Sequence, residues 1–153
     1  MKEEAPQLPP DPNLYLFRCA LIGSEGVGKS SLIERYLHGT FNENGGTPTA
    51  TAVVEREKNN IKVENKNILL KIYDFPSGLE NTSGGITSKA FVFLVYDVTK
   101  KSSFENIEDQ IENFNNLNKN PKKLLYIVAN KTDIGGREVT EEMGRQVAQT
   151  YGC

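Results

Sequence analysis

Several short apolar runs stand out along the chain, and they predict β-strands. Residues 52–57 and 61–64 form a weaker candidate strand region. The strong runs are apolar at both odd and even positions, which suits a parallel sheet covered by helices on both faces. These runs cover residues 14–22, 68–73, 91–96 and 124–129.

Apolar residues spaced three and four positions apart predict helices between these runs, at 29–38, 103–117 and 138–151. Gly39 is a plausible end for the first helix, and Ser102 or Ser103 and Thr140 are the expected N-caps of the other two. The alternation of strands and helices predicts a three-layer α/β fold with a mostly parallel sheet. Ligands in such sheets bind at the carboxyl ends of the strands.

A glycine-rich segment lies between the first predicted strand and helix. Residues 23–30 fit the phosphate-binding loop pattern G-x-x-x-x-G-K-[ST]. Glycines let backbone N–H groups face phosphate oxygens, and the following helix presents its positive end to them. Lys29 is expected to neutralise phosphate charge and Ser30 to offer its hydroxyl to Mg²⁺. The residues expected to surround the phosphates are Ser24, Glu25, Gly26, Val27, Gly28, Lys29 and Ser30.

A second motif follows the predicted strand at 124–129. Asn130, Lys131 and Asp133 fit the pattern N-K-x-D. A carboxylate at Asp133 can accept hydrogen bonds from both guanine N1–H and the exocyclic amine, whereas adenine lacks this donor pair. Asn130 is expected to tie the base and the loops together, and the stem of Lys131 to cover the ring. The two motifs together predict a guanine-nucleotide site.

Beyond the two motifs, residues 94–99 and 103–106 resemble a strand and the entry to the next helix in the Ras superfamily of small GTPases. The resemblance runs from about residue 15 to 153 and is strongest to the Rab and Ras branches. It implies the P-loop NTPase fold, GTP or GDP with Mg²⁺ as cofactors, and a switching GTP hydrolase. It also implies that Ser31 binds the α-phosphate, that Phe41 packs against guanine and that Asp97 is a buried strand-end residue.

The resemblance further implies two Mg²⁺-associated residues. Thr49 corresponds to the switch I threonine, with Thr47 and Thr51 as neighbouring alternatives, and Asp74 to the aspartate that holds Mg²⁺ through water. Together with Ser30 these are the expected metal-site residues. Lys29, Thr49 and Gly78 are the expected catalytic residues.

The chain departs from the family pattern in the hydrolytic segment. Where the family has D-T-A-G-Q, residues 74–80 read D-F-P-S-G-L-E. One inserted residue after Asp74 places Leu79 at the glutamine position, and leucine cannot orient a water. Without the insertion, Gly78 is displaced instead. Glu25 also stands where the family carries a small residue. We therefore expect slow hydrolysis and a poor response to an activating protein.

Composition limits the expected partners and cellular location of the protein. Net charge is −2, with no sustained basic block, so we expect no nucleic-acid partner. Two cysteines far apart in sequence imply no disulfide framework and fit a reducing cytosol. The chain has no membrane-spanning run, and we expect no membrane anchor in it. We expect a cytoplasmic monomer, peripheral to a membrane only if a prenylated tail exists beyond this chain. His38 is expected at the surface and Cys19 in the core. Regulators, effectors and exchange factors would bind through the switch regions.

The expected domain boundaries are a disordered leader at 1–13 and a GTPase domain at 14–153. Relative to the family, the domain is expected to lack its last strand and helix. Two other functions stay open: a pseudo-GTPase interaction module, favoured by Leu79 and Glu25, and an ATP-using P-loop enzyme, against which Asp133 argues.

Overall fold

The computed structural model describes residues 11–43, 53–76, 90–118 and 124–153. They form one five-stranded sheet in the order β2-β3-β1-β4-β5. β1 pairs in parallel with β3 and β4, and β4 with β5, whereas β2 and β3 are antiparallel. The predicted α/β fold with a mostly parallel sheet is confirmed. The strands are β1 (Leu14–Ile22), β2 (Val54–Val63), β3 (Lys66–Asp74), β4 (Phe91–Asp97) and β5 (Leu125–Asn130).

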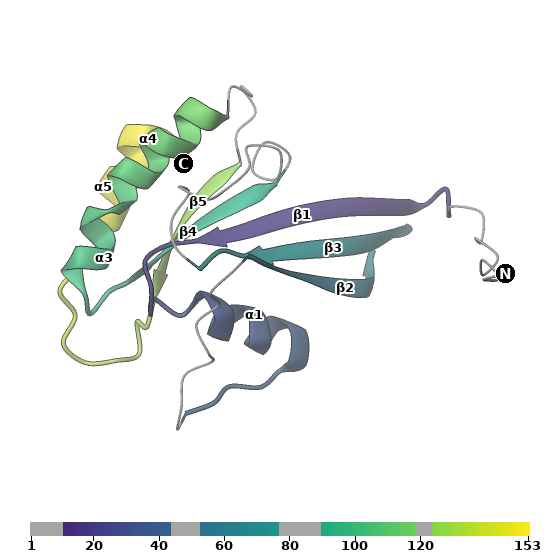
Figure 1. Cartoon of the computed structure of the whole chain (residues 1–153), viewed down its shortest axis with the longest axis horizontal. Helices are drawn as coiled ribbons and strands as arrows, with labels where there is room; N and C mark the ends of the chain where they lie inside the picture. Colours follow the sequence, from purple (N-terminus) through teal and green to yellow (C-terminus); the bar gives the residue numbers. More distant parts are fainter. Residues whose placement is uncertain (1–10, 44–52, 77–89, 119–123) are drawn as a thin grey trace, which may run out of the picture.

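Helices lie on both faces of the sheet, which gives the three predicted layers (Figure 1). One face carries α3 (Lys101–Glu105), α4 (Ile107–Leu117) and α5 (Glu141–Tyr151). The other face carries α1 (Lys29–His38). This helix ends where predicted, because Gly39 adopts a left-handed conformation (φ 70°) and its N–H donates to Arg35 O.

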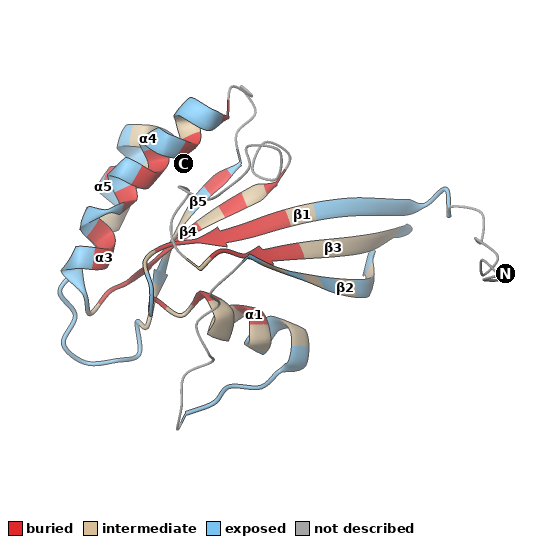
Figure 2. Ribbon diagram, viewed as in Figure 1, coloured by how far each residue is buried: buried red, intermediate tan, exposed pale blue. Residues whose placement is uncertain are grey.

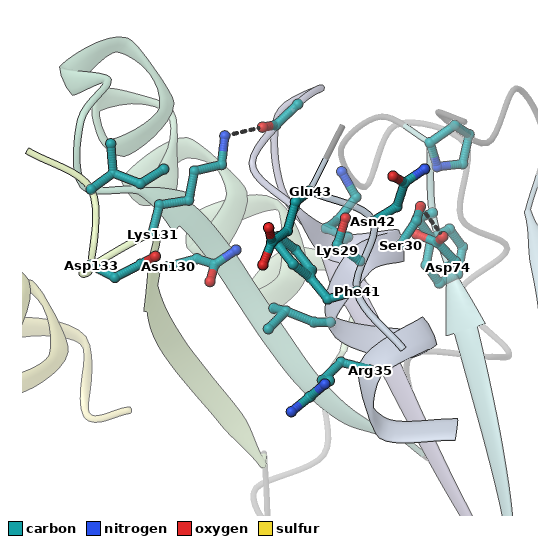
Figure 3. A pocket seen from close by; sticks show the side chains of 17 residues that line it. Lys29, Ser30, Arg35, Phe41, Asn42, Glu43, Asp74, Asn130, Lys131 and Asp133 are labelled. Atoms are coloured by element: carbon teal, nitrogen blue, oxygen red, sulfur yellow. Dashed lines mark hydrogen bonds between the residues drawn. The ribbon is translucent and has the colours of Figure 1, made fainter. Parts of the chain in front are cut away.

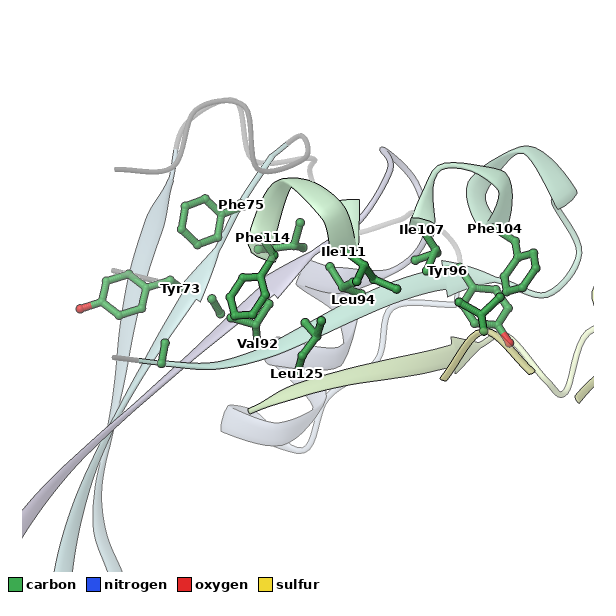
Figure 4. Packing of buried hydrophobic residues seen from close by; sticks show 14 of the residues in the cluster. Tyr73, Phe75, Val92, Leu94, Tyr96, Phe104, Ile107, Ile111, Phe114 and Leu125 are labelled. Carbon is green, nitrogen blue, oxygen red and sulfur yellow. The ribbon is translucent and has the colours of Figure 1, made fainter. Parts of the chain in front are cut away.

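The sheet separates two apolar cores. The larger lies beneath α3, α4 and α5, where Phe114 and Ile111 are fully buried against Val92 and Leu94 (Figure 4). The smaller lies beneath α1 and includes Ile33, Val27 and Cys19. Cys19 is buried, as predicted, and its burial raises the pKa of the thiol to about 11.

Two predicted strands are less buried than expected (Figure 2). The side chains of residues 14–17 are exposed, because β4 pairs with β1 only from Cys19 to Ile22. In β5, the edge strand of the described sheet, Leu125 is buried but Tyr126 is 45% exposed. A continuous apolar run therefore did not guarantee burial on both faces.

The predicted helix at 103–117 is wrong at its start and in its continuity. It begins at Lys101, breaks at Asn106 and continues as α4. Neither predicted serine caps it. The Lys101 N–H instead donates to Glu138 Oε2 at 2.7 Å, and Ser103 Oγ donates to Lys100 O. A long-range contact here replaces the local cap that the sequence predicted.

Other boundaries differ less. β2 is one strand with a register irregularity between Lys58 and Ile61, rather than two pieces. The last helix begins at Glu141 rather than 138, since the N–H groups of Glu138 and Val139 both donate to Val98 O. Its N-cap is Thr140, as predicted, whose Oγ1 accepts from Met143 N.

Two peripheral features bear on earlier predictions. The side chain of His38 is 58% exposed, as expected for a surface residue. Of the predicted leader, residues 11–13 are described. They form a turn in which Asp11 accepts hydrogen bonds from the Asn13 N–H and from Asn67 Nδ2, both at 2.8 Å.

Candidate functional site

A pocket of about 500 Å³ opens where β1, β3 and β5 reach their carboxyl ends and α1 begins (Figure 3). It brings the phosphate loop and the N-K-x-D segment together, although they are far apart in sequence. Ten predicted site residues line it: Gly26, Gly28, Lys29, Ser30, Ser31, Phe41, Asp74, Asn130, Lys131 and Asp133.

Backbone conformation shapes the phosphate loop. Gly28 is the N-cap of α1, with φ +100°, and no side chain caps this helix end. A Cβ at Gly28 would lie 2.4 Å from Asn130 Nδ2, so only glycine fits against this amide. The first-turn N–H groups of α1 therefore lie beside the pocket without a side-chain cap, the arrangement that binds anions at helix N-termini.

Lys29 is the buried cation of the site. Its residue is 6% exposed, and Nζ donates to Gly23 O at 2.8 Å and to Ser24 O at 3.0 Å. Burial lowers the pKa of Lys29, whereas the charges of Asp74 and Glu25 favour its protonated form. The ammonium is thus held beneath the loop on carbonyl oxygens.

Ser30 and Asp74 form the candidate cation site. Ser30 Oγ donates to Asp74 Oδ2, and Asp74 is 2% exposed. Among the described residues, Asp74 Oδ1 is buried without a hydrogen-bond partner. A buried carboxylate oxygen with a neighbouring hydroxyl fits a hard cation such as Mg²⁺.

The described part of the chain holds no cluster of three or more histidine, cysteine or acidic residues that could bind a metal alone.

Two side chains of the N-K-x-D segment connect it to the phosphate loop. Asn130 Nδ2 donates to Val27 O at 2.8 Å, and Lys131 Nζ donates to Gly26 O at 2.7 Å. Lys131 also forms an ion pair with Asp97, with 2.7 Å between Nζ and Oδ2. Asn130 and Lys131 therefore each join the segment after β5 to the phosphate loop.

Asp97 is 1% exposed, as the family resemblance implied. Its burial alone would raise the pKa of the carboxyl group. Hydrogen bonds from Lys131 and Thr99 outweigh that effect and hold the pKa below its usual value. Asp97 is therefore a carboxylate at neutral pH.

Seven residues that line the pocket were not predicted from the sequence. Arg35 lies one helical turn beyond Ser31 on α1, so the spacing of four residues was an available signal. The others are sequence neighbours of predicted residues: Leu32, Asn42, Glu43, Phe75, Pro76 and Ile134.

The remaining predicted residues do not line the pocket. Glu25 is exposed and Val27 is buried beneath the loop; Ser24 contributes its carbonyl to Lys29. Five other predicted residues lie outside the described residues: Thr47, Thr49, Thr51, Gly78 and Leu79.

Phe41, one of the predicted residues that line the pocket, has a relative exposure of 62%.

Among the described residues, no helix combines the length and the apolar character that crossing a membrane requires.

A family model and individual relatives both show similarity of this chain to Ras-related proteins. The Ras family matches residues 18–153. The chain is 33% identical over 143 residues to Ras-related protein RABA6b from Arabidopsis thaliana and to human Ras-related protein Rab-8B, each covering 90% of this chain. It is 34% identical over 146 residues to human Ras-related protein Rab-12, covering 92%. It spans 60%, 67% and 58% of these three relatives, respectively.

Proposed function

Because this chain belongs to the Ras family of small GTPases, we propose that it binds GDP and GTP with Mg²⁺ and acts as a guanine-nucleotide switch. One observation carries the proposal: the phosphate loop and the N-K-x-D segment line a single pocket and are joined by the Asn130–Val27 hydrogen bond. Neither motif alone specifies both the phosphates and the base.

On the phosphate side, the first-turn amides of α1 and the ammonium of Lys29 would meet the phosphate oxygens. Ser30, Asp74 and Thr49 would hold Mg²⁺, which neutralises charge on the phosphates when bound. Ser31 would contact the α-phosphate. The unpaired Asp74 Oδ1 supports this assignment, since a buried carboxylate oxygen requires a partner.

On the base side, Asp133 would accept two hydrogen bonds from guanine. The stem of Lys131 and the ring of Phe41 would cover the two faces of the base. Phe41 supports this role because its ring lines the pocket and is 62% exposed, which leaves apolar surface for a planar ligand.

Nucleotide binding is tested with fluorescent GDP and the full chain in Mg²⁺, competed with unlabelled GDP, GTP and ATP. We expect GDP and GTP to displace the probe, and ATP to compete at least about a hundredfold more weakly, because adenine would leave Asp133 unpaired. Equal competition by ATP would favour an ATP-using enzyme. A folded chain that binds no nucleotide would favour an interaction module.

We further propose that hydrolysis is slow. If Leu79 stands at the family's glutamine position, no side chain there orients a water. The carboxylate of Glu25 adds negative charge close enough to act on Lys29. A pseudo-GTPase that binds guanine nucleotide without hydrolysing it is the second candidate, favoured by the same two residues.

Single-turnover hydrolysis of bound GTP is expected at least tenfold below the intrinsic rate of Ras, about 4 × 10⁻⁴ s⁻¹. The double variant Glu25→Gly/Leu79→Gln is expected to raise the rate at least about tenfold, since it removes a repulsive charge and adds a water-orienting amide. Leu79→Met in place of Leu79→Gln is the matched control, because methionine keeps the size of leucine without an amide. A wild-type rate equal to that of Ras would contradict this proposal.

The switch would work through ordering of residues around Thr49 and after Asp74 on the γ-phosphate and Mg²⁺. Effectors, exchange factors and activating proteins would bind there, in signalling or vesicle traffic. We propose a monomeric domain at 14–153 that acts in the cytoplasm. A surface that is identical in the GDP and GTP states would favour the pseudo-GTPase instead.

A further inference from the structure

The Asp97–Lys131 ion pair joins two neighbouring parallel strands at the edge of the pocket. Asp97 ends β4 and pairs in register with Asn130, the last residue of β5. Lys131 follows directly, and its ammonium lies 2.7 Å from both Asp97 Oδ2 and Gly26 O. Figure 3 shows the Lys131 side chain extended along the rim of the pocket. One lysine thus connects β4, β5 and the phosphate loop.

Asp97 is a rigid partner because each carboxylate oxygen has its own contacts. Oδ1 accepts from the Thr99 N–H at 2.8 Å and from Thr99 Oγ1 at 2.6 Å, and Oδ2 faces Lys131. The main-chain N–H of Asp97 donates to Ser103 Oγ at 3.0 Å. The carboxylate is therefore held by contacts that do not involve Lys131.

Lys131 needs such a partner for two reasons. A free lysine side chain populates many rotamers, and ordering it costs conformational entropy. Its backbone is also in the left-handed region, with φ +61°, which residues other than glycine seldom adopt. The fixed carboxylate favours one extended conformation of the side chain, and in that conformation its stem borders the space assigned to the base.

We propose that Asp97 is a positioning residue for guanine-nucleotide binding. It does not line the pocket, and it acts by holding the ammonium of Lys131, so that the lysine stem stays beside the base and the phosphate loop stays joined to β5. This inference rests on the proposed function, because it assigns a role in the same guanine site.

The alternative is a purely structural role, in which the ion pair only stabilises the end of β4. The two oxygens allow the roles to be separated. Asp97→Asn keeps an Oδ1 that accepts from Thr99 but replaces the oxygen that faces Lys131. Thr99→Val removes the Oγ1 contact with Oδ1, but it keeps the main-chain N–H contact with Oδ1 and the lysine contact with Oδ2. It is therefore the matched control.

The decisive experiment is a double-variant cycle on the dissociation rate of fluorescent GDP from the full chain. We expect D97N and K131M each to speed release by about tenfold, the size expected for losing one charge-assisted hydrogen bond. We expect D97N/K131M to release GDP no faster than K131M, since both changes break one chain of contacts. T99V should change release less than about twofold.

Each other result contradicts the proposal in a distinguishable way. Independent, multiplying effects of D97N and K131M would show that Asp97 does not act through Lys131, while GDP binding by the wild type would leave the proposed function intact. A wild type without guanine-nucleotide binding would overturn both. If thermal unfolding shows that D97N does not fold, K131R, which keeps a cation for Asp97, must release GDP more slowly than K131M; equal rates would overturn the proposal.

Discussion

Replacing Asp133 with asparagine is expected to weaken GDP binding by about a hundredfold and to shift the preference of the pocket from guanine to xanthine. The carboxylate accepts from two neighbouring donors of guanine. An asparagine amide accepts at one position and donates at the other, so it opposes the guanine amine. Xanthine carries a carbonyl oxygen where guanine carries this amine, and it therefore matches asparagine.

The measurement is competition of GDP and xanthosine diphosphate against fluorescent GDP and its xanthine counterpart. Glu112→Gln is the matched control, because it removes one exposed carboxylate on α4, away from the pocket residues. Equal affinity of the wild type and Asp133→Asn for GDP would show that Asp133 does not read the base.

The second large effect concerns stability. Replacing Gly23 with alanine is expected to lower the free energy of unfolding by at least about 3 kcal/mol. A Cβ at Gly23 would lie 2.2 Å from Val95 O, and φ is +153°. The clashing atom belongs to the backbone of a central strand, so no side chain can move aside to relieve it. Urea unfolding measures the change.

Gly136→Ala supplies the control for this experiment. Gly136 also has a positive φ, +83°, but nothing lies within 4 Å of the Cβ that alanine would add. We expect a loss of only about 1 kcal/mol there, from backbone strain alone. Similar losses at Gly23 and Gly136 would mean that the contact with Val95 is not tight.

The sequence predicted best those elements whose cause is local. α1 begins at a glycine N-cap and ends at Gly39, and its bounds match the prediction. The start of α3 at Lys101 and the late start of α5 were not predictable, because the contacts at these two helix starts are long-range: Lys101 N–H to Glu138, and Glu138 N–H to Val98 O. The local spacing of apolar residues does not indicate either of these two contacts.

The same distinction holds for the site. Lys29, Asn130 and Asp133 were identified from motifs, since fixed spacing reflects the shape of one loop. Asp97 and Lys131 lie on different segments, and their ion pair depends on the register of β4 against β5. The sequence suggested that Asp97 is buried but not what it holds.

The strand order β2-β3-β1-β4-β5 also constrains how the chain can fold during synthesis. β1 is made first, yet its neighbours on both sides, β3 and β4, come later, and the Asn130 contact with Val27 requires residues beyond them. The phosphate loop is therefore synthesised early, and the pocket can form only after the N-K-x-D segment has been synthesised. A nucleotide that contacts both the phosphate loop and the N-K-x-D segment would bind only the nearly complete sheet. A higher nucleotide concentration would therefore stabilise the fully assembled sheet relative to partly folded intermediates.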